Sequence, residues 1–181
     1  MKRIIVLAVI ASLILAVVAV ETGVYNMAAT EKHWVVTEKM IAWVRDNSID
    51  ARAKEYRVPP LDDERLVLDG AVHYDAMCTI CHLAPGMQPT ELSRGLYPQA
   101  PQFYLYEPIL DEAQKLEQAQ RYFWVIKNGL KMTAMPAWGL SHDDDGMWAI
   151  VAFVQKLGGM TPEQYRHFVQ TTEDHAHDHS E

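Results

Sequence analysis

The chain has 181 residues, a hydrophobic fraction of 49% and a formal net charge of −8 at pH 7. This length suffices for one globular domain with attachments, not for two full domains. The acidic balance argues against a nucleic-acid partner, and the sequence contains no glycine-rich phosphate loop and no serine or cysteine triad.

Apolar residues are concentrated at the N-terminus, where Ile4 to Val20 contains no charge and follows Lys2 and Arg3. As a helix this run is about 25 Å long, slightly short of a hydrocarbon core of about 30 Å, and the following residues can extend it. We favour an uncleaved transmembrane anchor over residues 1–30; the alternative is a signal peptide cleaved after Val17-Val18-Ala19. The two basic residues stay inside, so we expect a single-pass protein of the bacterial inner membrane with its remaining part in the periplasm.

Residues 31–61 form a mixed-charge segment in which we expect an amphipathic juxtamembrane helix and a linker. Apolar residues recur there at helical spacing, at Val36, Met40, Trp43 and Val44. Trp34 and Trp43 are candidates to rest at the membrane interface or on a transmembrane helix of a partner. His33 is a lone histidine, more often solvated or hydrogen-bonded than a metal ligand. Val58-Pro59-Pro60 ends the helix and marks a domain boundary.

The only two cysteines lie in Cys78-Thr79-Ile80-Cys81-His82. This spacing indicates covalent attachment of a c-type haem, because two thiols can add to the porphyrin vinyl groups while the adjoining imidazole binds iron. A thioredoxin-like pair would need a preceding strand, a disulfide would close a short strained ring, and a zinc site would need further ligands. We therefore expect one covalent haem c on Cys78, Cys81 and His82, with no cysteine left for a lipid anchor.

A second stretch supplies a candidate for the sixth iron ligand. The spacing predicts a helix over 111–128 that ends at Asn128-Gly129, just before a methionine-containing loop. Met135 precedes a proline and is bracketed by Gly129 and Gly139, so the backbone can turn to present its sulfur. A thioether ligand favours Fe(II) and raises the reduction potential. Met132 and Met87 are rival candidates.

The remaining helices and the loop between them are predicted from helix-capping residues and from prolines and glycines that end helices. Asp62-Asp63-Glu64 begins a helix that runs into the cysteine motif, and a proline-rich loop after it would wrap the haem. Ser141 is the expected cap of the last core helix, which stops at Gly158-Gly159, and a short helix then runs to about Gln170.

Charge and composition distinguish two further regions. Residues 62–110 are acidic, whereas Lys127 and Lys131 flank the methionine loop and predict a locally basic docking patch. The tail, 172–181, is expected to be disordered. Its alternating histidines are a weak candidate metal site that would suit Cu(II), Ni(II) or Zn(II): His175, His177 and His179. A polar, solvated chain end explains these histidines equally well.

The cysteine motif and the stretch Asn128-Gly-Leu-Lys-Met-Thr-Ala-Met-Pro-Ala-Trp-Gly139 together resemble the class I c-type cytochromes, and more closely their small, membrane-anchored, monohaem bacterial members. The resemblance covers about residues 62–158 and implies an all-α fold with a haem domain at 62–171. It also implies that the first and last core helices cross at Gly70, Tyr74 and Phe153. A proline carbonyl would hold the proximal histidine, with Pro101 matching that position better than Pro98, and Met135 would be the distal ligand.

The function predicted is that of a membrane-tethered periplasmic cytochrome c carrying one electron through a His/Met-ligated haem, not an enzyme by itself. Its expected partners are membrane redox complexes, as electron donor and acceptor, and lipid around the N-terminal helix. One alternative is a haem c subunit of a stable membrane oxidoreductase. A haem-based sensor or a metal-handling protein is the other.

Overall fold

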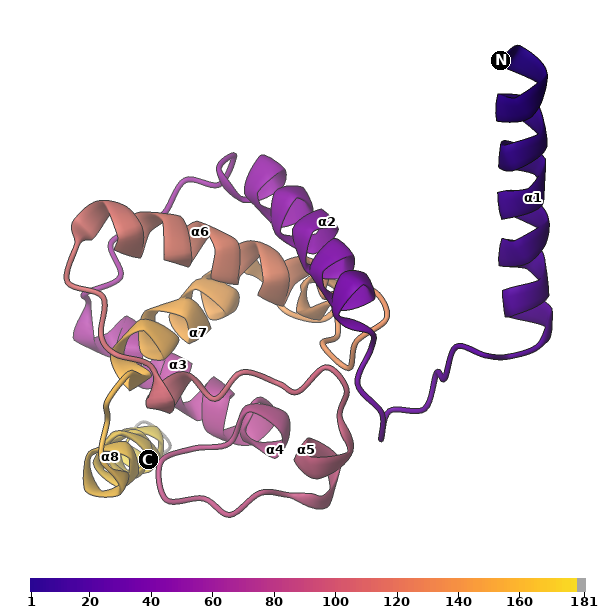
Figure 1. Cartoon of the computed structure of the whole chain (residues 1–181). Helices are drawn as coiled ribbons and strands as arrows, with labels where there is room; N and C mark the ends of the chain where they lie inside the picture. Colours follow the sequence, from indigo (N-terminus) through magenta and orange to yellow (C-terminus); the bar gives the residue numbers. More distant parts are fainter. Residues whose placement is uncertain (179–181) are drawn as a thin grey trace.

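The computed structural model describes the backbone of residues 1–178 and the side chains of residues 1–170. Within that part the chain folds into eight α-helices with two short 3-10 turns and no strand, which confirms the all-α prediction. Helix α1 (Lys2–Glu21) stands apart from the other helices in Figure 1, and none of its residues is buried. The helix has 20 residues, and an 18-residue window within it has a mean hydropathy of 3.0, so α1 is long and apolar enough to cross a membrane.

Helices α3 (Glu64–Met77) and α7 (Asp144–Leu157) cross at the centre of the core. Gly70 permits this crossing, because a Cβ atom there would overlap the backbone carbonyl of Ala149 and lie 3.0 Å from Cβ of Phe153. One turn later Tyr74 meets the same phenylalanine, with ring centroids 5.5 Å apart. The predicted contact of Gly70 and Tyr74 with Phe153 is therefore confirmed.

The start of α7 differs from the prediction. Asp143, not Ser141, is the N-cap residue, and its carboxylate accepts a hydrogen bond from the Gly146 backbone N–H. Ser141 instead closes the preceding 3-10 turn (Trp138–Leu140), where its N–H donates to the Trp138 carbonyl. The 3-10 turn thus ends before Asp143, and the Asp143 carboxylate caps α7.

Helix α6 (Glu112–Asn128) lies on α7 and ends at the predicted residue. Its Phe123 is fully buried and stacks on Trp148 of α7, with ring centroids 3.8 Å apart. Aromatic pairs of this kind add to the free energy of burying their surface. The end of α6 is thereby held firmly where the methionine loop begins.

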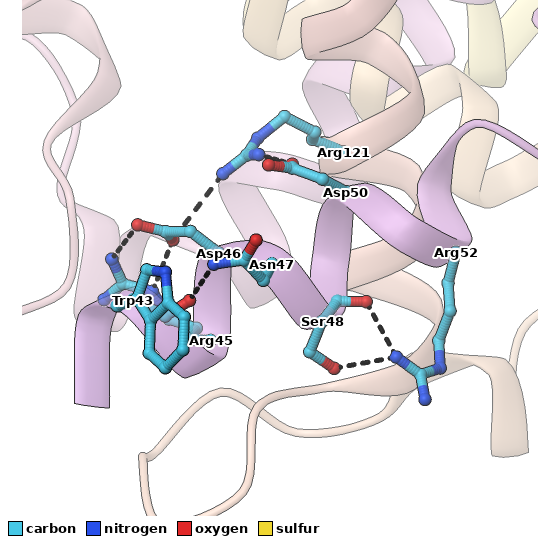
Figure 2. A network of polar contacts seen from close by, with 8 residues as sticks. All are labelled: Trp43, Arg45, Asp46, Asn47, Ser48, Asp50, Arg52 and Arg121. Atoms are coloured by element: carbon cyan, nitrogen blue, oxygen red, sulfur yellow. Dashed lines mark hydrogen bonds and ion pairs between the residues drawn. The ribbon is translucent and has the colours of Figure 1, made fainter. Parts of the chain in front are cut away.

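Helix α2 (Val35–Ala53) packs against α6, as Figure 1 shows, so the predicted boundary at 58–60 does not separate it from the rest of the domain. Ile49 and Ala53 are buried, and Figure 2 shows Arg121 of α6 reaching two aspartates of α2. The inner face of α2 mixes acidic with apolar residues, so it lacks the continuous apolar stripe that would have announced this packing.

Helix α8 (Pro162–Asp178) packs on α3, where the Tyr165 hydroxyl donates a 2.7 Å hydrogen bond to the Asp75 carboxylate. The helix continues past the predicted end at Gln170, because residues 171–178 contain neither glycine nor proline to stop it. The expectation of a disordered tail therefore does not hold over 172–178. The side chains of His175 and His177, and the whole of His179, lie outside the described residues.

Candidate haem site

The cysteine motif forms a single turn at the end of α3. Helix α4 (Thr79–His82) follows Cys78 directly, and the His82 N–H donates a 2.8 Å hydrogen bond to the Cys78 carbonyl. The Thr79 hydroxyl continues the helical pattern by donating to the Asp75 carbonyl at 2.8 Å. Both thiols are free of disulfide bonds and only partly exposed. The local fold therefore presents two thiols and one imidazole from one short segment.

The His82 imidazole is oriented by the backbone of the following loop. Its Nδ1 lies 2.8 Å from the Pro101 carbonyl oxygen. A carbonyl can only accept, so Nδ1 carries the proton and Nε2 keeps its lone pair for a metal ion. Burial lowers the pKa of His82, which favours the neutral ring that binds metals. The Pro101 contact expected from the family resemblance is confirmed, and Pro98 does not fill that position.

An aromatic ring supports the histidine from the side. Phe103, in the 3-10 turn Phe103–Leu105, stacks on the His82 ring with centroids 4.9 Å apart and planes 19° apart. Tyr122 of α6 meets the edge of the same phenylalanine at 5.3 Å. The proline-rich loop thus fixes both the tautomer and the plane of His82.

The thiols do not have the electrostatics of a redox dithiol. Burial, and then the neighbouring Cys81, raise the pKa of the Cys78 thiol to about 12. A disulfide oxidoreductase needs the opposite, a thiolate stabilised at neutral pH. The thioredoxin-like alternative therefore loses its chemical basis here.

The methionine loop is held by its own backbone. After Gly129, the Leu130 N–H donates to the Met135 carbonyl at 3.1 Å, and the Met135 N–H donates to the Thr133 hydroxyl at 3.1 Å. Met135 packs against the hydrophobic core, whereas Met132 is 86% exposed. The loop therefore directs the Met135 side chain toward the core and the Met132 side chain toward solvent. Sequence reasoning missed the role of Thr133 as the hydrogen-bond acceptor for the Met135 N–H. Its position two residues before Met135 was the signal that could have indicated this contact.

The expected basic patch beside this loop is weaker than predicted. The Lys127 ammonium lies 2.6 Å from a carboxylate oxygen of Asp144, and it also lies over the rings of Tyr56 and Phe123. Lys127 therefore has a carboxylate partner within the domain. Lys131 remains exposed on the loop.

The described residues offer no alternative metal site. Among them, no group of three histidine, cysteine, aspartate or glutamate side chains is arranged to hold an ion. His33 is engaged elsewhere, since its Nδ1 lies 2.7 Å from the Tyr25 hydroxyl. The proposed tail site lies outside the side chains that the structure describes.

Two neighbouring thiols that can bond the porphyrin vinyl groups, a neutral and oriented imidazole that can bind iron, and a thioether on a nearby loop form a set of side chains that fits a c-type haem. Residues 65–154 match the family model described as Cytochrome C oxidase, cbb3-type, subunit III. A comparison with curated proteins finds no match. The matched region begins in α3, contains the cysteine turn and the methionine loop, and ends in α7. This part of the chain is a cytochrome c domain of the class I c-type family, a haem-based electron-transfer unit.

Proposed function

We propose that the chain is a membrane-tethered periplasmic electron carrier that holds one haem c. Thioether bonds to Cys78 and Cys81 would attach the haem, and His82 and Met135 would hold its iron. The observation that carries this proposal is the 2.8 Å contact between His82 Nδ1 and the Pro101 carbonyl, because it leaves Nε2 free and aimed by a fixed ring. The haem, when bound, supplies a one-electron change at iron.

The residues of the chain would bind the haem, orient its ligands and shield the iron. Pro101 and Phe103 hold the proximal imidazole in one tautomer and one plane. Met135, held by the Leu130 and Thr133 hydrogen bonds, would close the sixth position against other ligands. Haem iron held by two protein ligands would suit electron transfer rather than the binding of a substrate.

Helix α1 supports the tether. It is apolar and unburied, and the two basic residues at its start favour an orientation with the haem domain outside the cytoplasm. The proposed division of the chain is the anchor at 1–30, α2 with its linker at 31–61, and the haem domain at 62–171, with α2 packed on that domain through α6. A reporter fused after Glu181 should be active only outside the cytoplasm. A trimmed protein that begins near Val20 and leaves the membrane would instead identify a signal peptide.

A stable oxidoreductase subunit is the second candidate, because the matching family is described as an oxidase subunit. Purification from membranes in mild detergent separates the two functions. A carrier should elute alone, whereas a subunit should elute with a fixed amount of a larger redox protein. The donor and acceptor would be identified from that partner.

Acid–acetone extraction tests the attachment. The colour should stay with the polypeptide, and Cys78→Ala or Cys81→Ala should reduce or abolish maturation. Colour lost entirely to the solvent would contradict covalent attachment. Carbon monoxide separates a carrier from a gas sensor, since a reduced carrier with both axial positions filled should resist the ligand.

A further inference from the structure

Helix α2 carries two distinct faces. Its inner face holds Ile49 and Ala53, both buried against the domain, and the two aspartates that pair with Arg121 of α6. Its outer face is an apolar stripe with relative exposures of 70, 59, 69 and 56% at Val36, Met40, Trp43 and Val44. At about 100° per residue the centres of the two faces are about 115° apart. Folding of the domain therefore accounts for the inner face and leaves the outer stripe uncovered.

The outer stripe lies on the half of α2 that is nearest to α1. Only a short linker joins the two helices, and it is folded back on itself: the Tyr25 hydroxyl lies 2.7 Å from His33 Nδ1, and the Tyr25 ring meets Trp34 at 4.8 Å. The His33 N–H also donates to the Tyr97 hydroxyl at 2.9 Å. These contacts hold the start of α2 close to the chain segment that leaves α1, and in that segment the exposed Gly23 adopts φ +64°, a conformation that favours glycine.

The residues of the stripe suit a lipid interface. Trp34 and Trp43 combine an apolar ring with an N–H donor, and tryptophan is enriched at headgroup depth. The aliphatic side chains of the stripe can enter the acyl boundary, and the exposed Lys32 and Lys39, which are close to the stripe in sequence, have stems long enough to reach phosphate groups. An exposed apolar stripe of this kind marks an interaction surface.

We propose that the outer stripe of α2 lies in the interfacial layer of the membrane that α1 crosses. This inference rests on the proposed tether. Arg121 couples α2 to α6, as Figure 2 shows, with the Asp46 side chain 3.6 Å away and Asp50 in direct ion-pair contact. In the same view the Trp43 ring points away from Arg121. A seated α2 would therefore orient the whole haem domain on the membrane surface, presenting one fixed face to partners.

Spin labelling of the full-length, haem-loaded protein in vesicles of phosphatidylcholine and phosphatidylglycerol tests this proposal. A nitroxide is attached in turn to Met40→Cys, on the outer stripe, and to Glu38→Cys, an exposed position two residues earlier on the other side of α2. Oxygen concentrates in lipid and a nickel chelate stays in water, so their collision rates report depth. The proposal expects the label at 40 to gain oxygen collisions and lose nickel collisions relative to the label at 38.

Flotation of the same vesicles separates the inference from the tether on which it depends. Protein that does not float with the vesicles overturns both. Floating protein whose label at 40 is as accessible to nickel as the label at 38 overturns the interfacial seat and leaves the tether standing. A label at 40 shielded from both reagents is buried against protein, and that result also rejects lipid as the occupant.

Discussion

Replacing Gly129 by alanine should disturb the methionine loop at its first residue. Gly129 caps α6 with φ 66° and ψ −176°, a conformation that is essentially restricted to glycine and costs other residues about 1–3 kcal/mol. An added Cβ would also lie 2.8 Å from the Ala137 nitrogen and 2.9 Å from the Met135 carbonyl oxygen. These neighbours are backbone atoms that cannot rotate away, and such overpacking costs about another 1–3 kcal/mol.

The combined destabilisation is about 2–6 kcal/mol if the loop keeps its position. In a protein of this size even the lower end corresponds to a fall of about 4–8 °C in melting temperature. The loop can relieve the strain by moving, but the Leu130 to Met135 hydrogen bond begins at the next residue, so movement would draw Met135 out of place. Gly129→Ala should therefore lose stability, sulfur ligation, or both.

The assay compares Gly129→Ala with Gly95→Ala, since a Cβ at Gly95 would meet nothing within 4 Å. Thermal unfolding, the far-red sulfur-to-iron charge-transfer band of the oxidised protein, and carbon monoxide binding to the reduced protein are measured for both. The control should match the wild-type protein. If Gly129→Ala also matched it in all three measurements, the proposed role of this turn in presenting Met135 would be wrong.

Three further substitutions test the packing. Gly70→Ala should cost about 1–3 kcal/mol or more, because the added methyl meets the Ala149 backbone, and an unchanged denaturant midpoint would contradict the helix crossing. Tyr165→Phe should cost about 1–2 kcal/mol by removing the 2.7 Å hydrogen bond to Asp75, and proteolysis within α8 should quicken; unaltered cleavage would show that this bond does not hold α8. Arg121→Gln should cost about 1 kcal/mol or less, since its ion pairs are partly exposed, and a larger loss in thermal unfolding would mean that charge, not apolar burial, holds α2.

The sequence predicted the elements whose chemistry is local. The cysteine turn and the end of α6 at Asn128 follow from short motifs and helical spacing, the all-α class follows from the family resemblance, and the structure has all three. The partner of His82 came from resemblance alone, because 19 residues separate the imidazole from the Pro101 carbonyl that holds it. The axial role of Met135 stays a prediction, although burial distinguishes it from Met132.

Interactions between distant segments were the ones that sequence reasoning missed. The inner face of α2 joins aspartates to Ile49 and Ala53, and its partner Arg121 lies far along the chain, so no periodic stripe announces the packing on α6. Lys127 was assigned to a docking surface because Asp144, its partner, is 17 residues away. Both errors arise from judging charged residues by their sequence neighbours.

The distal ligand decides whether the electron-carrier account holds. Oxidised wild-type protein should show the weak far-red charge-transfer band of methionine ligation; Met135→Ala should abolish it, lower the reduction potential and open the reduced iron to carbon monoxide. Met132→Ala, at the exposed position of the same loop, should change none of these. A band lost in Met132→Ala but kept in Met135→Ala would move the ligand along the loop, and wild-type protein that lacks the band and binds carbon monoxide readily would contradict the carrier function itself.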